Sequence, residues 1–132
     1  MTTVLFACVH NAGRSQIAAA LFNNYANPGK CWAISAGTHP ADRVHPEVVT
    51  AMQARGIDLS TQTPQRLTPE LASTATWLIT MGCGDECPVV PGTNRADWAI
   101  PDPKGQTPEG VAGIIETIDN LVRSFIKDSC EA

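Results

Sequence analysis

A run of apolar and β-branched residues, TTVLFAC at residues 2–8, is separated by only five residues from a helical pattern that starts at Arg14. From there, apolar residues recur at three- and four-residue spacing as far as Tyr25, and the turn NPG follows at residues 27–29. A continuous apolar strand that leads through a short loop into a helix is typical of a parallel sheet covered on both faces. This feature therefore predicts an α/β fold.

The alternation of strands and helices continues to the end of the chain. After the first helix we predict a strand at 31–38, a helix at 45–57, a short helix after Thr68, strands at 75–81 and 96–100, and a last helix that begins near Pro108. The predicted architecture is a three-layer α/β sandwich with a four-stranded, mostly parallel sheet. The length of 132 residues and the absence of a linker or repeat indicate one domain, residues 1–132.

The charge and the hydropathy pattern exclude several classes of protein. The net charge is −4, and the pI of about 5.2 is too low for a broad basic surface that would bind nucleic acid or anionic lipid. No apolar segment is long enough to cross a bilayer, and the N-terminus lacks the pattern of a signal peptide. We therefore expect a cytoplasmic protein with no membrane partner. The five cysteines are an odd number in such a chain, which argues against a structural disulfide framework.

The loop after the first strand has the pattern C-x5-R-S, from Cys8 to Ser15. Its five central residues are Val9, His10, Asn11, Ala12 and Gly13. Their backbone N–H groups, with those of the first helical turn, are able to converge on one tetrahedral oxyanion, and Arg14 adds a bidentate guanidinium. The same positive field favours the thiolate of Cys8, and the Ser15 hydroxyl is placed to donate to that sulfur. We interpret the segment as an oxyanion site with its own nucleophile.

A simpler interpretation treats Cys8 as a buried small residue and Arg14 as a surface charge. The position of the pattern between a strand and a helix, with Gly, Asn and Ser in place, favours the functional interpretation. The loop is not a P-loop, because it lacks the G-x4-G-K pattern.

The segment CVHNAGRS and the dipeptide at Asp102 and Pro103 resemble the low-molecular-weight tyrosine phosphatase superfamily. The resemblance implies the fold of that superfamily, with Cys8 as the nucleophile, Arg14 as the anion clamp and Asp102 as the general acid. It also implies supporting roles for Ser15, Asn11 and Ser35. Without the resemblance, Asp102 would be an ordinary turn carboxylate.

Two further thiols, Cys83 and Cys87, follow the third predicted strand and so lie at the same sheet edge as Cys8. A phosphatase needs one cysteine, whereas three indicate thiol–disulfide exchange. With MGCGDECPVVPG, DWAIPDPKGQT and AISAGT, nearly the whole chain is similar to the arsenate reductases of that superfamily. This similarity implies that Cys8 attacks arsenate, that Cys83 and then Cys87 resolve the adduct, and that an external reductant restores the thiols. That reductant is thioredoxin, or mycothiol with mycoredoxin if an external thiol replaces the relay.

Several alternatives stay open at this point. One alternative is a low-molecular-weight tyrosine phosphatase, and another is a sensor of oxyanions or arsenic without turnover. Zinc held by Cys83, Cys87 and His10 is disfavoured by the C-x3-C spacing, so we expect no metal and no bound cofactor. Of the remaining cysteines, we expect Cys31 in the core and Cys130 as an exposed thiol of the tail.

Overall fold

The computed structural model describes residues 1–82, 87 and 89–130. In chain order, the elements are β1 (Thr2–Cys8), α1 (Arg14–Tyr25), β2 (Cys31–Gly37), α2 (Pro46–Gln53), α3 (Pro69–Ser73), β3 (Trp77–Thr80), β4 (Asn94–Asp97) and α4 (Pro108–Ser129).

The four strands form one parallel sheet in the order β2-β1-β3-β4, which confirms the predicted α/β class. β1 lies inside the sheet and pairs with β2 on one side and β3 on the other. The register aligns Cys8 with Gly37, and Ala7 with both Ala36 and Thr80. The carboxyl ends of the three strands therefore meet beside Cys8, as a shared ligand site at this edge requires.

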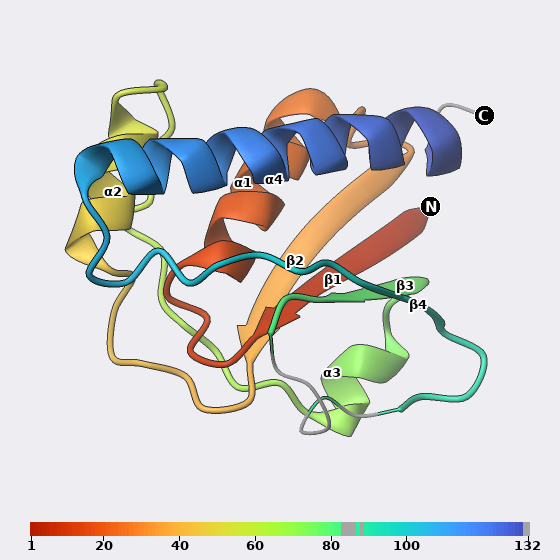
Figure 1. Ribbon diagram of the computed structural model, residues 1–132. Coiled ribbons are helices and arrows are strands. Elements are labelled where there is room, and N and C mark those ends of the chain that lie inside the picture. The colour runs from red at the N-terminus through yellow and green to blue at the C-terminus, as the bar shows by residue number, and fades with distance from the viewer. Residues whose placement is uncertain (83–86, 88, 131–132) are drawn as a thin grey trace.

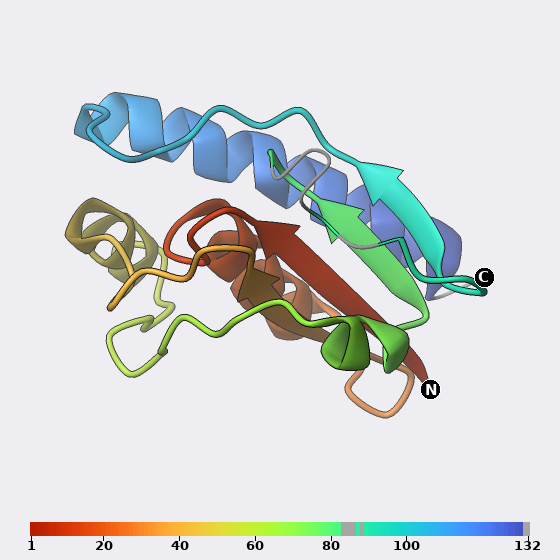
Figure 2. The same cartoon turned by 90° about the horizontal axis from the view of Figure 1, so that it is seen from below.

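Helices cover the two faces of the sheet unequally (Figures 1 and 2). On one face, alternate residues of β1 such as Val4 and Phe6 pack in the larger core with α1, α2 and α4. On the other face, Leu5 and Ala7 pack in a smaller core with α3. The three predicted layers are present, and β1 is buried on both sides. Within the described part of the chain, none of the helices is long and apolar enough to span a membrane.

The boundaries of several elements differ from the predicted ones. α2 ends at Gln53 because the next turn tightens, with the N–H of Arg55 donating to Met52 and that of Gly56 to Gln53, and Gly56 has a positive φ of 82°. β4 is Asn94–Asp97 instead of 96–100. The chain leaves the sheet after the N–H of Trp98 donates to Thr80, and the carbonyl oxygen of Ile100 accepts a hydrogen bond from Arg14.

Thr68 and Thr107 begin two helices by capping them. The Thr68 hydroxyl accepts a hydrogen bond from the N–H of Leu71, and the Thr107 hydroxyl accepts one from Gly110. A proline follows each threonine at the first helical position, where its missing N–H costs nothing. The predicted cap at Thr68 is therefore confirmed.

The prediction that the chain has no structural disulfide, with Cys130 as an exposed thiol, is wrong. Cys31 at the start of β2 and Cys130 at the end of α4 are joined by a disulfide, although they are 99 residues apart in sequence. Cys31 is buried, as expected. The pairing could not be read from the spacing, because only packing brings the last turn of α4 beside β2.

Loss of this disulfide should destabilise the fold, because it closes a very long loop in the unfolded chain. We expect Cys130→Ser to lower the free energy of unfolding by about 2 to 4 kcal/mol, measured by urea denaturation without reductant. The variant Cys31→Ser breaks the same bond. The double variant with both serines should therefore have nearly the same free energy of unfolding as Cys31→Ser alone. Equal stability of wild type and Cys130→Ser would show that the bond does not form in solution.

Candidate anion site

Cys8 is the last residue of β1 and lies at the start of the anion loop, residues 8–15. Its side chain is buried, and it is a free thiol. Its Sγ lies 2.9 Å from the Oγ of Ser15, which is the second residue of α1 and is itself fully buried. The predicted nucleophile and its hydroxyl partner are therefore in contact.

Asn11 holds the centre of the loop in a backbone conformation that favours glycine, with φ of 50°. It is fully buried, and its Nδ2 donates to the Oγ of Ser15 at 2.7 Å. Its Oδ1 accepts from the backbone N–H of Gln65 at 2.9 Å. Because the Ser15 oxygen accepts from Asn11, the hydroxyl hydrogen is free to donate to the Cys8 sulfur, as it must when the sulfur is a thiolate that has no proton of its own.

The carbonyl groups of the loop accept hydrogen bonds from N–H groups of the segment at residues 38–45. Those of Cys8, Val9, His10 and Ala12 accept from the N–H groups of Thr38, His39, Ala41 and His45, respectively. Within the described residues, the N–H groups of residues 9–13 make no backbone hydrogen bond. The loop therefore keeps its donors for a ligand while its acceptors are satisfied, which is the arrangement of an anion-binding nest.

Arg14 lies over this loop and is held by the segment that follows β4. Its Nη1 donates to the carbonyl oxygen of Ile100 at 3.1 Å, and its Nη2 lies 4.0 Å from the Oδ2 of Asp102. Gly82, with a positive φ of 96°, lies against the guanidinium, so that a Cβ there would be 2.4 Å from Nη1. The predicted clamp and the predicted acid are thus brought together, and Gly82 leaves room for the clamp.

Asp102 is half exposed and belongs to a turn that is packed on the loop. Its Oδ1 accepts from the N–H of Lys104 at 3.0 Å. The neighbouring Pro103 lies against Gly13, where an added Cβ would be only 2.8 Å from the Pro103 ring. The glycine therefore lets the acid-bearing turn approach the anion loop closely.

His45 lies beside Gly13 and caps α2. Burial lowers the pKa of His45, while the nearby carboxylates of Glu47 and Asp102 act in the opposite direction. The histidine is therefore mainly neutral at neutral pH, and Arg14 supplies the side-chain cation of the site.

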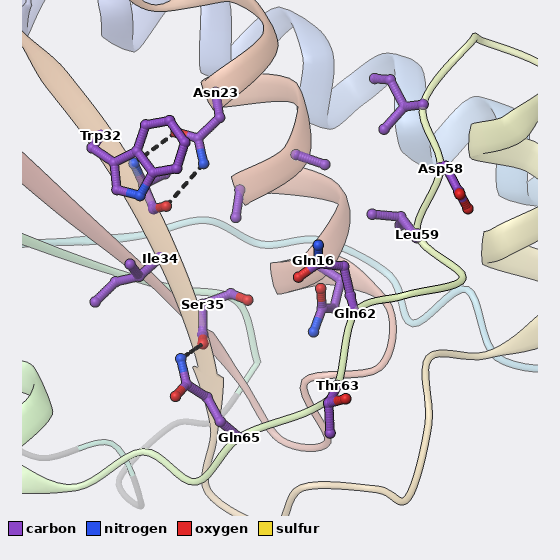
Figure 3. Close-up of a pocket in the computed structure, with 14 residues that line it drawn as sticks. Gln16, Asn23, Trp32, Ile34, Ser35, Asp58, Leu59, Gln62, Thr63 and Gln65 are labelled. Carbon is purple, nitrogen blue, oxygen red and sulfur yellow. Dashed lines mark hydrogen bonds between the residues drawn. The ribbon is translucent and has the colours of Figure 1, made fainter. Parts of the chain in front are cut away.

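A cavity of about 450 Å³ lies behind the loop, between α1, β2 and residues 57–65 (Figure 3). Ser35 and Gln65 lie in its wall, and the Nε2 of Gln65 donates to the carbonyl oxygen of Ser35 at 2.8 Å. Gln65 is also the residue whose backbone N–H holds Asn11. Ser35 is thus connected to the loop through Gln65, and we retain it as a proposed supporting residue.

The proposed redox pair is only partly described. Cys83 lies outside the described residues, so no geometry is given for it. Cys87 is buried in the smaller core with Ala7 of β1 and Leu78 of β3, and Ala7 directly precedes Cys8. Across the described ranges, no group of three His, Cys, Asp or Glu side chains is placed to hold a metal ion.

Residues 3–131 match the family model described as low molecular weight phosphotyrosine protein phosphatase. The chain belongs to this family. An arsenate reductase of Halalkalibacterium halodurans is 35% identical over 104 residues, which are 76% of this chain and 73% of that protein. A solved arsenate reductase in the phosphate-binding state is 30% identical with a TM-score of 0.81, and the match covers 97% of this chain and 98% of that chain.

A thioredoxin-dependent arsenate reductase of Corynebacterium glutamicum shows 41% identity to this chain and a TM-score of 0.83. The match covers 97% of this chain but only 61% of the other. This family member therefore spans less than two thirds of that relative's length.

Sequence reasoning missed three residues that shape the site in this family member. Gln65 and Ile100 act through their backbones, which leave no signal in the sequence. Gln16 lies directly after the motif, and its Nε2 donates to Asn11. Its position directly after the motif was the available signal in the sequence, and its burial is seen only in the structure.

Gly37 gives a direct steric test of the loop geometry. A Cβ at this position would lie 2.6 Å from the carbonyl oxygen of Val9 and 2.8 Å from the backbone N of Asn11. We expect Gly37→Ala to displace the loop and to weaken binding of inorganic phosphate about tenfold or more, measured by calorimetry. The matched control is Gly113→Ala, where the added methyl meets no atom within 4 Å. Equal phosphate affinity of wild type and Gly37→Ala would contradict the described loop.

Proposed function

We propose that this protein reduces arsenate to arsenite with Cys8 as the nucleophile. The observation that carries the proposal is the buried Cys8 thiol, hydrogen-bonded to Ser15 inside a loop whose N–H groups and Arg14 are arranged for a tetrahedral oxyanion. The similarity to arsenate reductases supports arsenic as the central atom.

In the first step, arsenate binds to the loop N–H groups and to Arg14. Nη1 of Arg14 donates to Ile100, and the guanidinium has further N–H donors for the anion. The Cys8 thiolate attacks arsenic and forms an S–As bond, and one arsenic–oxygen bond breaks. Asp102 gives its proton to the departing oxygen, which leaves as water. The Arg14 guanidinium is then near both the substrate and the carboxylate that changes charge.

In the second step, the Cys83 thiolate attacks the sulfur of Cys8. A Cys8–Cys83 disulfide forms, the S–As bond breaks with its electron pair on arsenic, and arsenite leaves with arsenic reduced from the +5 to the +3 state. Cys87 then attacks Cys83, which releases the Cys8 thiolate and transfers the disulfide to Cys83 and Cys87. Only three residues separate Cys83 from Cys87, a spacing that one helical turn can bring to bonding distance.

An external dithiol reductant completes the cycle. The thioredoxin-dependent relative supports thioredoxin in this role, and mycothiol with mycoredoxin is the second candidate. We place the reaction in the cytoplasm, where such thiol systems are kept reduced.

A tyrosine phosphatase is the main alternative, and the position of Tyr25 disfavours it. Tyr25 is the only tyrosine, and it ends α1 at the opposite end from Arg14, about 16 Å along the helix axis. Its hydroxyl is hydrogen-bonded to Asp119 and Arg123 of α4. No tyrosine is therefore available to line the anion loop and stack on an aryl phosphate.

We expect Cys8→Ser to abolish arsenate reduction, because a hydroxyl neither ionises at neutral pH nor forms the disulfide. Asp102→Asn should retain arsenate binding and slow turnover by about 10² to 10⁴-fold through loss of the acid. Arsenite formed by the purified chain is measured with thioredoxin, thioredoxin reductase and NADPH, and in parallel with mycothiol and mycoredoxin.

Cys130→Ser is the matched cysteine control and should retain turnover, because Cys130 lies at the far end of α4. Turnover by Cys8→Ser would end the proposed mechanism. Rapid aryl phosphate hydrolysis without arsenite formation would identify a phosphatase, and arsenate binding without either reaction would identify a sensor. If Cys83→Ser leaves thioredoxin-coupled turnover unchanged, the relay is replaced by the external-thiol route.

A further inference from the structure

We propose that Gln16 is a positioning residue for the Cys8 thiolate. Its amide sets the direction of the hydrogen bonds that run from Gln16 through Asn11 and Ser15 to the Cys8 sulfur. The inference rests on the proposed function only in taking Cys8 as the nucleophile.

The direction of the hydrogen bond from Ser15 to Cys8 depends on which way the Asn11 amide faces. With Nδ2 toward Ser15, the serine oxygen accepts, and its hydrogen is left for the sulfur. With the amide turned over, Oδ1 would face Ser15, and the serine hydrogen would be drawn to Asn11 instead. Cys8 would then lose its nearest side-chain donor, and its thiolate would be less stable.

Two donors hold the Asn11 amide in the productive orientation. Its Oδ1 accepts from the backbone N–H of Gln65 at 2.9 Å and from the Nε2 of Gln16 at 3.2 Å. Turning the amide over would place its NH₂ group against these N–H donors, which is unfavourable in a buried site. The backbone N–H of residue 65 does not depend on its side chain. The hydrogen bond from Gln16 is therefore the one of the two that a side-chain substitution removes.

The orientation of the Gln16 amide is itself determined. Its Nε2 also donates to the backbone carbonyl oxygen of Asn11, at 3.2 Å. Two oxygens of Asn11 therefore face the same end of the Gln16 side chain, and only the NH₂ end satisfies both. Gln16 is only 5% exposed and is one of the residues that line the cavity behind the loop (Figure 3). It therefore supports the left-handed backbone of Asn11 and its side chain at once.

Among the described residues, the side-chain hydrogen bonds of Gln16 go to Asn11, and none reaches Arg14 or Asp102. Its effect on the reaction is therefore expected to pass through the thiolate fraction of Cys8, rather than through the anion clamp or the acid.

The test replaces Gln16 with methionine, which has a similar length and no hydrogen-bond donor. The rate of Cys8 alkylation by iodoacetamide is followed as a function of pH, and the Cys8 peptide is quantified by mass spectrometry. The plateau of the alkylation rate at high pH reports how accessible the sulfur is. The midpoint of the curve is the pH at which half of the Cys8 side chains are thiolates. We expect the midpoint of Gln16→Met to rise by about half to one pH unit, with a corresponding loss of rate at pH 6.

The matched control is Gln62→Met, the same change in the same cavity at a side chain with no hydrogen bond to Asn11 among the described residues. Its midpoint should equal that of wild type. If Gln16→Met fails to fold by circular dichroism, Gln16→Glu keeps the side-chain length. Its ionised carboxylate offers only acceptors to the two Asn11 oxygens, so the midpoint should rise at least as far.

A double-mutant cycle with Ser15→Ala separates positioning from a general loss of structure. Without Ser15 there is no hydroxyl whose direction Asn11 can set, so Gln16→Met should no longer shift the midpoint. A shift of the same size with and without Ser15, or an unchanged midpoint in Gln16→Met, would overturn the proposal. The assay uses no arsenate, so its outcome is independent of whether the protein reduces arsenate.

Discussion

The burial of β1 on both faces determines where the functional groups of this protein lie. Four consecutive residues, Val4 to Ala7, have no exposed surface, and alternate side chains belong to the two cores on opposite faces. A strand buried in this way must have neighbours on both edges and helices above and below. It ends at Cys8, and the strand ends around it bring Gly37 and Thr80 to the same edge. The position of the thiol is thus a consequence of the core.

The loop at this edge is held by hydrogen bonds to its carbonyl groups, while the N–H groups of residues 9–13 make no backbone hydrogen bond among the described residues. The carbonyls of residues 8–12 accept from the segment at residues 38–45, with the exception of Asn11, whose carbonyl accepts from Gln16. The side chain of Asn11 connects Gln65, Gln16 and Ser15 within a buried region. In such a region a hydrogen bond made in the wrong direction leaves a donor or acceptor unpaired. The stability of the Cys8 thiolate therefore depends on which group donates in each of these hydrogen bonds as well as on their lengths.

The described cysteines fall into two groups. Cys8 ends β1 at the carboxyl edge of the sheet and Cys87 lies in the smaller core with Ala7, whereas Cys31 and Cys130 form a disulfide where β2 begins and α4 ends. Figure 1 shows that the N-terminus and the end of α4 lie at this second end, away from the strand arrowheads. Cys8, the proposed nucleophile, and the Cys31–Cys130 disulfide therefore lie at opposite ends of the strands.

The sequence by itself determined the α/β class, the bounds of β1 and α1, and the association of Cys8, Arg14 and Ser15. These follow from local apolar periodicity and from a motif that spans eight residues. Resemblance added Asp102, which the structure places 4.0 Å from Arg14.

Only the tertiary structure decided the end of β4, the Cys31–Cys130 disulfide, and the support of Asn11 by Gln16 and the backbone of Gln65. The physical reason is that backbone donors are chemically identical along the chain, and thiols carry no sign of their partner. Packing alone selects which of these groups come within bonding distance.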